Sequence, residues 1–343
     1  MTRVWFNRTF SNVRALLDLV RRGDEGGEFH LVCTHTQASF PGFAAAHEWA
    51  LEPAGLTGPG YIDYCLDFCR ERRIDALWPG KEARLLAEHR DRFAAEGVRV
   101  LSVASPENLD LLHDKARFSA QARHFFIPTP DTLECRTLEE FEAAYERLRA
   151  LHPVLCIKPA KGVNGAGFRV IEEGRRGLDI LVQGVLYAIH LDGLRQLLRE
   201  AGAFEPLLLM EHLDGAEYSV DSLGDGRRLV ALTQRRKETG AGYGQRITAL
   251  PALTQAVAEL TEIFGLTGLF NAQFREGRNG LRLLEINPRF AGGIGYTGAT
   301  SVNLPYLALH GLIRGFADDG PPLVAEESRI LEVPDYARIE VVV

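Results

Sequence analysis

Residues 1–105 alternate short apolar segments with amphipathic ones, and this alternation restricts the fold more than any other feature. The segments RVWF, FHLVCT, IDALWPG and VRVLSV have the composition of strands. Between them, FSNVRALLDLVRRG, YIDYCLDFCRERR and EARLLAEHRDRFAAEG have helical spacing. Repeated strand–helix units predict a parallel sheet with helices on its faces. No glycine-rich fingerprint follows the first segment, so the sequence does not support a dinucleotide site there.

The rest of the chain mixes helices with strand hairpins. SPENLDLLHDKARFSAQARHFF predicts one helix, with Ser105 as its cap and Pro106 at its first position. Further helices are predicted at TLEEFEAAYERLRALH and PALTQAVAELTEIFG, and hairpins turn at residues 224–226 and near residues 279–280. TGAGYGQR reads as a flexible loop. The chain is therefore predicted to be α/β in its first part and α+β after it.

Composition and charge exclude several classes of protein. The net charge of −7 and a pI near 5.9 disfavour a nucleic-acid partner, because phosphate backbones need a basic face. No long uncharged apolar run and no signal-peptide pattern is present, so we expect no membrane partner and a cytoplasmic location. Cys65 and Cys69 lie one helical turn apart, but no second pair completes a metal site, so reduced core thiols are the expectation for all five cysteines.

Lysine is rare in this chain. Lys and Arg together number 39, but only five are lysines, at positions 81, 115, 158, 161 and 237. A chain that otherwise uses arginine keeps lysine where a compact point charge is needed, for example against phosphate oxygens. The alternative is that codon bias left a few lysines at random.

The segment LRLLEINPR places three polar residues at the end of an apolar strand. Glu285, Asn287 and Arg289 share one face if the strand stays regular, and Pro288 ends its pairing. Across the predicted hairpin, Asn271 and Gln273 share a face. Carboxylate and amide oxygens of this kind suit Mg²⁺. The alternative is a solvated hairpin face.

The segment IKPAKGVNGAGF predicts a strand, a glycine-rich turn and a second strand. Lys158 ends the first strand, and Gly162, Gly165 and Gly167 follow it. Such a turn can present backbone N–H groups to phosphates, although it lacks the Gly-Lys-Ser/Thr of a Walker loop. The alternative is an ordinary hairpin with a flexible tip.

Two weaker patterns remain. In LLLMEHLDGAEYSVD, Glu211 ends an apolar strand, and Glu217, Ser219 and Asp221 then share one face, where they could receive an adenine amine and ribose hydroxyls. The alternative is a surface hairpin. Residues 293–298 match G-x-G-x-x-G, but no strand–helix–strand unit follows, so we expect glycines that open a helix and bind an anion rather than a dinucleotide.

In this order the segments LHDKARF, CIKPAKGVNGAGF, MEHLDGAEYSVD, NAQF and LLEINPR resemble the ATP-grasp superfamily of ATP-dependent ligases. The last two look closest to its carbamoyl-phosphate-synthetase and biotin-carboxylase-like branch. The resemblance covers residues 105–315. It implies a Rossmann-like pre-ATP-grasp domain at 1–105, an ATP-grasp N-lobe with a glycine-rich lid at 106–210 and a C-lobe with the metal site at 211–343.

The resemblance also implies a role for each matching residue. Lys115 and Lys158 would contact the phosphates of ATP, and the lid residues Lys161, Gly162, Gly165 and Gly167 would close over them. Glu211 and the backbone near Leu213 would hold adenine, and Glu217 would bind ribose. Gln273, Glu285 and Asn287 would hold Mg²⁺ or Mn²⁺, with Gln273 standing where many relatives have a carboxylate. Arg289 would stabilise the transferring phosphoryl group, and Lys237 would face the reaction centre.

The implied activity is a carboxylate–amine ligase that forms an acyl phosphate and releases ADP. Its partners would be a small carboxylic acid and an amine, and since many relatives are dimers, a homodimer is a further expectation. Two alternatives stay open: an enzyme that activates bicarbonate or another carboxylate, and an ATP-binding sensor without chemistry. The cationic segment TQRRKETGAGYGQR, which contains Arg235, Arg236, Lys237 and Arg246, suits an anionic substrate, or is a solvated loop.

Overall fold

The computed structural model describes residues 1–10, 12–160, 167–174, 177–182, 187–238, 244–317 and 320–331. These residues form two compact units. The first unit contains residues 1–110, 218–273 and 286–343, and the second contains residues 111–217 and 274–285. The three-part division expected from the sequence stays a prediction, and each unit is described separately.

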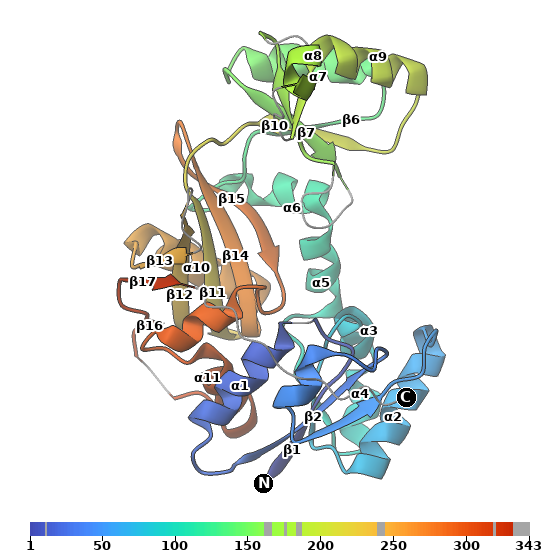
Figure 1. Ribbon diagram of the computed structural model, residues 1–343, viewed down its shortest axis with the longest axis vertical. Helices are drawn as coiled ribbons and strands as arrows, with labels where there is room; N and C mark the ends of the chain where they lie inside the picture. The colour runs from blue at the N-terminus through green and yellow to red at the C-terminus, as the bar shows by residue number, and fades with distance from the viewer. Residues whose placement is uncertain are drawn as a thin grey trace. The chain divides into compact units, whose positions relative to one another are not determined.

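A parallel sheet forms the N-terminal part of the first unit (Figure 1). Its order is β3-β2-β1-β4-β5, and every pairing is parallel. The strands are β1 (Thr2–Phe6), β2 (Phe29–His35), β3 (Glu48–Leu51), β4 (Ala76–Trp78) and β5 (Arg99–Val100). The parallel sheet predicted from the alternating segments is therefore confirmed.

Helices cover both faces of this sheet because successive strand residues point to opposite sides. Trp5 packs on the face covered by α2 (Gly58–Arg72) and α4 (Arg90–Ala95), whereas Val4 and Phe6 pack on the face covered by α1 (Val13–Gly23). The single helix predicted for residues 82–97 is wrong, since α3 (Ala83–Glu88) ends at His89 before α4 begins.

A seven-stranded, mainly antiparallel sheet follows in the order β15-β14-β11-β12-β13-β17, with β16 paired to β12. Its strands are β11 (Glu217–Asp225), β12 (Leu229–Lys237), β13 (Gly244–Thr248), β14 (Thr267–Gly277), β15 (Gly280–Asn287), β16 (Leu323–Val324) and β17 (Ser328–Leu331). The helices α10 (Pro251–Phe264) and α11 (Leu304–Arg314) accompany it. Both predicted hairpin turns are confirmed, and the boundary between the units falls within β14 and β15.

The second unit is built on a sheet of order β6-β10-β7-β8-β9. Its strands are β6 (Thr132–Cys135), β7 (Leu155–Pro159), β8 (Arg169–Glu172), β9 (Ala188–His190) and β10 (Leu207–Glu211). Its helices are α6 (Lys115–Gln121), α7 (Leu138–Arg149), α8 (Gly177–Val182) and α9 (Leu191–Ala201). Leu155, Ile157 and Leu209 pack on one sheet face with Phe141 of α7 and Leu194 of α9, which makes that face the core.

The helix predicted over residues 105–126 is interrupted. Ser105 Oγ accepts a hydrogen bond from Asn108 N at 3.2 Å, so the predicted cap of α5 (Pro106–His113) is confirmed. The chain then breaks at Asp114, whose carboxylate accepts from Arg117 N at 3.0 Å and caps α6. A second N-cap inside the segment is what divides it into two helices, before the 3₁₀ turn η2 (Ala122–His124).

The glycines of residues 293–298 do not open an α-helix. They form a 3₁₀ turn, η3 (Ile294–Ala299), and α11 begins only at Leu304, capped by the Asn303 side chain. The expectation that these glycines open an α-helix is therefore wrong, and anion binding by this turn stays a prediction. A shorter 3₁₀ turn, η1 (Pro41–Ala45), lies between β2 and β3.

Two bulk expectations can be compared with the structure. Within the described ranges, no helix is long and apolar enough to span a membrane. All five cysteines are buried free thiols, and burial raises the pKa of Cys156 to about 12. Such thiols are packing groups rather than nucleophiles.

Candidate active site

Lys158 lies on the face of β7 opposite to the face that α7 and α9 cover. Leu155 and Ile157 point into the core under α7 and α9, so strand alternation turns Cys156 and Lys158 to the opposite face. In the antiparallel register, Lys158 is directly opposite Leu208 of β10. The lysine is therefore held by two paired strands.

A small apolar layer surrounds the stem of this lysine. Cys156, Ala160, Leu208 and Met210 form one buried cluster, against which Phe168 packs. An apolar strand face beside a cation suits a flat ring that carries anionic groups. Gly167, just before Phe168, has a φ of +78°, and a Cβ there would lie 2.6 Å from Pro159 Cδ, so this position needs glycine.

The electrostatics of Lys158 favour an anion. Its pKa is lowered by burial first and by the repulsion of the Lys115 ammonium second, while Cys156 and Glu285 act in the opposite direction. Lys115 is the first residue of α6, directly after the Asp114 cap. Two ammonium groups close enough to repel each other form a site where a phosphate chain would be stabilised.

Glu211, the last residue of β10, lies on the other face of the sheet. It shares its side with Leu209 rather than with Met210, and its side chain is buried. Arg282 Nε lies 3.2 Å from its Oε1, and His152 Nδ1 lies 3.5 Å from its Oε2. The predicted contact of Glu211 with adenine stays a prediction, since the structure shows its carboxylate paired with these two groups.

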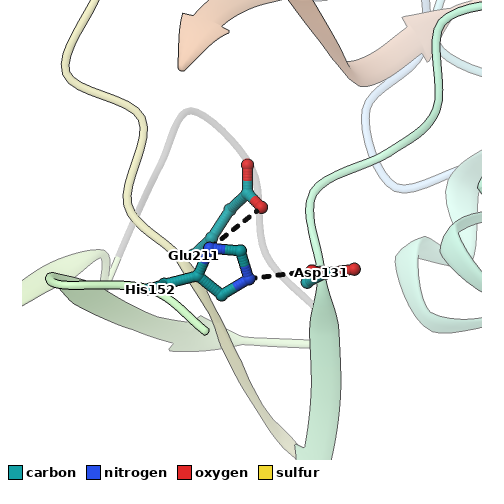
Figure 2. Close-up of side chains that lie close together, drawn as sticks. All are labelled: Asp131, His152 and Glu211. Carbon is teal, nitrogen blue, oxygen red and sulfur yellow. Dashed lines mark hydrogen bonds and ion pairs between the residues drawn. The ribbon is translucent and has the colours of Figure 1, made fainter. Parts of the chain in front are cut away.

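His152 lies between two carboxylates, as Figure 2 shows. Its Nε2 is 2.8 Å from Asp131 Oδ2, and its Nδ1 faces Glu211. The three residues stand just before β6, before β7 and at the end of β10, and their ligand atoms lie within 4.8 Å of one another. Arg282 already neutralises Glu211, so we interpret the group as a clamp on three strand ends rather than as a metal centre.

The segment between β10 and β11 packs on the β14–β15 hairpin residues of the same unit. Leu213 is buried, and a Cβ on Gly277 would lie 2.6 Å from its Cδ2. Gly215 N donates to Glu276 O at 3.0 Å. Glu217 is the first residue of β11, and its Oε2 lies 4.0 Å from Arg275 Nη1. Leu213 and Glu217, the predicted adenine and ribose contacts, are thus fixed at either end of one packed segment.

The three predicted metal ligands fall in different units. Gln273 and Asn287 belong to the first unit and Glu285 to the second, so the metal site stays a prediction. Asn287 is the last residue of β15, which confirms that pairing ends before Pro288. Arg289 lies beyond the strand, with its guanidinium 4.9 Å from the ring centre of Phe10.

Arg235 was missed as a structural residue. The sequence placed it in a cationic loop, but it lies in β12 and is almost fully buried, so that expectation is wrong. Its Nε lies 2.6 Å from Asp221 Oδ2, its Nη1 donates to Gln245 Oε1 at 2.6 Å and its Nη2 donates to Ser219 Oγ at 3.0 Å. Asp221 and Ser219 are therefore committed to this arginine, and the predicted contact with ribose or adenine does not hold for them.

Two of the remaining predicted residues lie in strands. Lys237 ends β12, and Arg246 lies in β13 rather than in a loop. Lys161, Gly162 and Gly165 lie outside the described residues. Gly293 approaches Arg235 so closely that a Cβ would lie 2.3 Å from its Nη1, which explains one glycine of the turn after β15.

Solved structures share this architecture. N5-carboxyaminoimidazole synthetase from Staphylococcus aureus matches with a TM-score of 0.65 and 12% identity, over 95% of this chain and 80% of that one. The biotin carboxylase domain of the Hydrogenobacter thermophilus 2-oxoglutarate carboxylase was solved with MgADP, ADP and bicarbonate. It matches with a TM-score of 0.61 and 15% identity, over 93% of this chain and 71% of that one. L-amino acid ligase from Bacillus licheniformis matches with a TM-score of 0.59 and 14% identity, over 92% of this chain and 74% of that one. The fold is the ATP-grasp fold.

Sequence comparisons agree with the fold. Residues 203–335 match the family described as ATP-grasp in the biosynthetic pathway with Ter operon. The carbamoyl phosphate synthase large chain of Thermomicrobium roseum is 27% identical over 276 residues, which is 73% of this chain. The match spans only 24% of that relative's length. The sequence match to an ATP-grasp family therefore covers residues 203–335, and the solved structures extend the likeness in fold over nearly the whole chain.

Proposed function

We propose that this protein is an ATP-dependent carboxylate–amine ligase that acts through an acyl phosphate and releases ADP and phosphate. The observation that carries the proposal is the pair of lysines in the second unit. Lys158 and Lys115 place two positive charges beside an apolar strand face, in a chain with the ATP-grasp fold. Solved structures of this fold hold ADP and magnesium.

The second unit would bind the nucleotide. Lys158 and Lys115 would contact its phosphates, and the apolar layer around Met210 would receive the base. Glu217 would bind ribose, and adenine would be held through the backbone of Glu211 and of the residues near Leu213, because the Glu211 carboxylate lies on the other face of the sheet. Lys161, Gly162, Gly165 and Gly167 would form the lid that keeps water from the intermediate.

The metal ligands and the reaction centre complete the proposal. Gln273, Glu285 and Asn287 offer the hard oxygen atoms that Mg²⁺ or Mn²⁺ prefers. The ion would supply positive charge against the β- and γ-phosphates. Arg289 would stabilise the transferring phosphoryl group, and Lys237 would face it.

The chemistry follows from the weakness of a carboxylate as an acyl donor. Transfer of the γ-phosphoryl group to a carboxylate oxygen breaks the bond to ADP and gives an acyl phosphate. The amine then attacks the carbonyl carbon, phosphate leaves with the former carboxylate oxygen, and the amine loses a proton. The protein has to align the reactants and neutralise charge.

A second candidate is activation of bicarbonate or of a carboxylate without an amine acceptor. It is favoured by the similarity to a carbamoyl phosphate synthase chain and to a carboxylase domain solved with bicarbonate. A homodimer stays a prediction for either activity.

The test measures nucleotide products from Mg·ATP with pools of small carboxylic acids crossed with pools of amines. ADP release that needs both an acid and an amine would support the ligase, and splitting the pools would identify the substrates. ADP release with an acid or bicarbonate alone would favour the second candidate. AMP release would contradict the acyl-phosphate route, and tight ATP binding without turnover in any pool would favour a sensor.

A further inference from the structure

The parallel sheet of the first unit has a topological switch point between β1 and β4. Chain order runs outward in opposite directions from these two strands, and ligands of such sheets bind beyond the carboxyl ends of the strands at this place. Here the two following loops are fixed to each other. Gly80 N donates to Asn7 Oδ1 at 2.8 Å, and Lys81 N donates to Arg8 O at 3.2 Å.

Arg8, the second residue after β1, is held in an unusual conformation. Its φ is +31°, which is rare for a residue with a side chain and marks a backbone held by its surroundings. Its Nε donates to Glu52 Oε2 at 3.0 Å, its Nη1 donates to Leu56 O at 3.1 Å, and its guanidinium lies 4.1 Å from the ring centre of Tyr61. Its Nη2 is buried and has no hydrogen-bond partner. An orphaned donor of this kind is costly unless a ligand uses it.

The carboxylate beside Arg8 is already saturated. Glu52 is 4% exposed and also accepts from Thr34 Oγ1 at 2.6 Å and from Tyr61 OH at 3.2 Å. It therefore fixes the guanidinium and has little remaining capacity. Glu82 is a weaker neighbour, since its carboxylate lies 3.8 Å from Arg8 Nη1 and is partly exposed.

Two more donors converge on this edge. Lys81 is exposed, and the part of the chain that the structure describes gives its ammonium no ion pair. His35 ends β2, and its pKa is lowered by burial first and by the Lys81 and Arg8 charges after it, with Glu52 opposing them. Its Nδ1 accepts from Gln37 N at 3.1 Å, so in the neutral ring Nε2 carries the proton and is a donor.

The same loop leads to the proposed reaction residue Arg289. Phe10, two residues after Arg8, lies against the Arg289 guanidinium, and Asn12 Nδ2 donates to Ala291 O at 2.7 Å. An anion held by Arg8 would thus be bound by a loop that also contacts Arg289.

The geometry points to an oxyanion-binding site at this switch point, formed by Arg8 Nη2, the Lys81 ammonium and the His35 ring. Its ligand is a carboxylate or phosphate group of the substrate. The role of that group as part of a ligase substrate rests on the proposed function, but the binding of the anion does not.

The test titrates nucleotide-free protein with labelled histidine, at low salt, with inorganic phosphate and separately with acetate. The His35 ring signal, assigned with His35→Gln, should shift saturably, and bound anion should raise the His35 pKa. Lys81→Gln and Arg8→Lys should each weaken binding about tenfold, as expected for one charge-assisted hydrogen bond. Arg8→Lys keeps a cation beside Glu52, and Lys81 is exposed, so thermal melting should show that both variants fold.

Arg90→Gln is the matched control, because it removes an exposed charge from the same unit, and it should bind as the wild type does. Tighter binding of phosphate than of acetate would indicate a phosphorylated substrate, and tighter binding of acetate would indicate a carboxylic acid. No saturable His35 shift with either anion, or unchanged affinity in Lys81→Gln, would overturn the site. The titration is repeated in Lys158→Met, since phosphate could also bind between the nucleotide lysines. ADP release without anion binding would refute this site alone, and anion binding without ADP release would refute only the ligase.

Discussion

Arg235 and Lys158 show two ways of keeping a cation away from water. Arg235 is almost fully buried, and Asp221, Gln245 and Ser219 take up its three donor nitrogens. Lys158 is half-buried beside the like charge of Lys115, and within the described ranges it forms no hydrogen bond or ion pair. The comparison teaches that burial alone does not identify a functional cation. We expect the number of donors left without a protein acceptor to identify such a cation instead.

Arg8 lies between these extremes. Two of its nitrogens are used within the protein, and one buried nitrogen is not. On this scale we expect Arg235 to contribute stability, Lys158 to contribute binding, and Arg8 to contribute both.

The largest effect should come from breaking the saturated pair. Arg235→Met leaves the buried Asp221 carboxylate without its cation and should lower the free energy of unfolding by about 3–5 kcal/mol. Denaturant unfolding measures this loss of free energy, and Arg90→Met, which changes an exposed arginine, is the matched control. The double variant Arg235→Met/Asp221→Leu should recover part of the loss. A single-variant loss no larger than that of Arg90→Met would contradict the structural role.

Lys158→Met should reduce turnover and leave stability intact. ADP release should fall about 100- to 1,000-fold, as when one donor to a developing charge is removed, while the free energy of unfolding should not decrease. Arg169→Met is the matched control. Arg169 lies on the neighbouring strand β8 opposite Ile157 of β7, so it is on the core side of the sheet and not on the side of Lys158. If Lys158→Met unfolds easily and still turns over ATP, the lysine is structural and the comparison fails.

The lowered pKa of Lys158 predicts a pH dependence. Its pKa is below the ordinary value of 10.5 in the folded state, so between the two values the unfolded chain binds more protons and stability rises with pH. Below the folded pKa the penalty for the charged lysine is fully present. Lys158→Met should therefore exceed the wild type in stability most at neutral pH, and the gap should narrow as pH approaches 10.5. A gap that widens would contradict the burial of the ammonium.

The sequence could predict what depends on local pattern. Alternation turned Lys158 away from the core strand face, and Pro288 ended β15 where expected. It could not predict that Arg235 leaves the cationic segment for the interior, because its partner Asp221 is brought opposite only by the pairing of β11 and β12. The His152 clamp joins three strand ends that are distant in the chain, and no local spacing shows it.

The smallest effect on stability should come from changing His152, which bridges Asp131 and Glu211. Asp131 is largely exposed and can return to water, and Glu211 keeps Arg282, so His152→Gln should lower the free energy of unfolding by only about 1 kcal/mol. Arg282→Leu is the comparison variant, and its loss should be larger, since it removes the closer charge from a buried carboxylate. If His152→Gln costs more than Arg282→Leu, the imidazole is the main partner of Glu211. Added Zn²⁺ should not raise the melting temperature of the wild type. If it does so only when His152 is present, the three side chains form a metal site and the clamp interpretation is wrong.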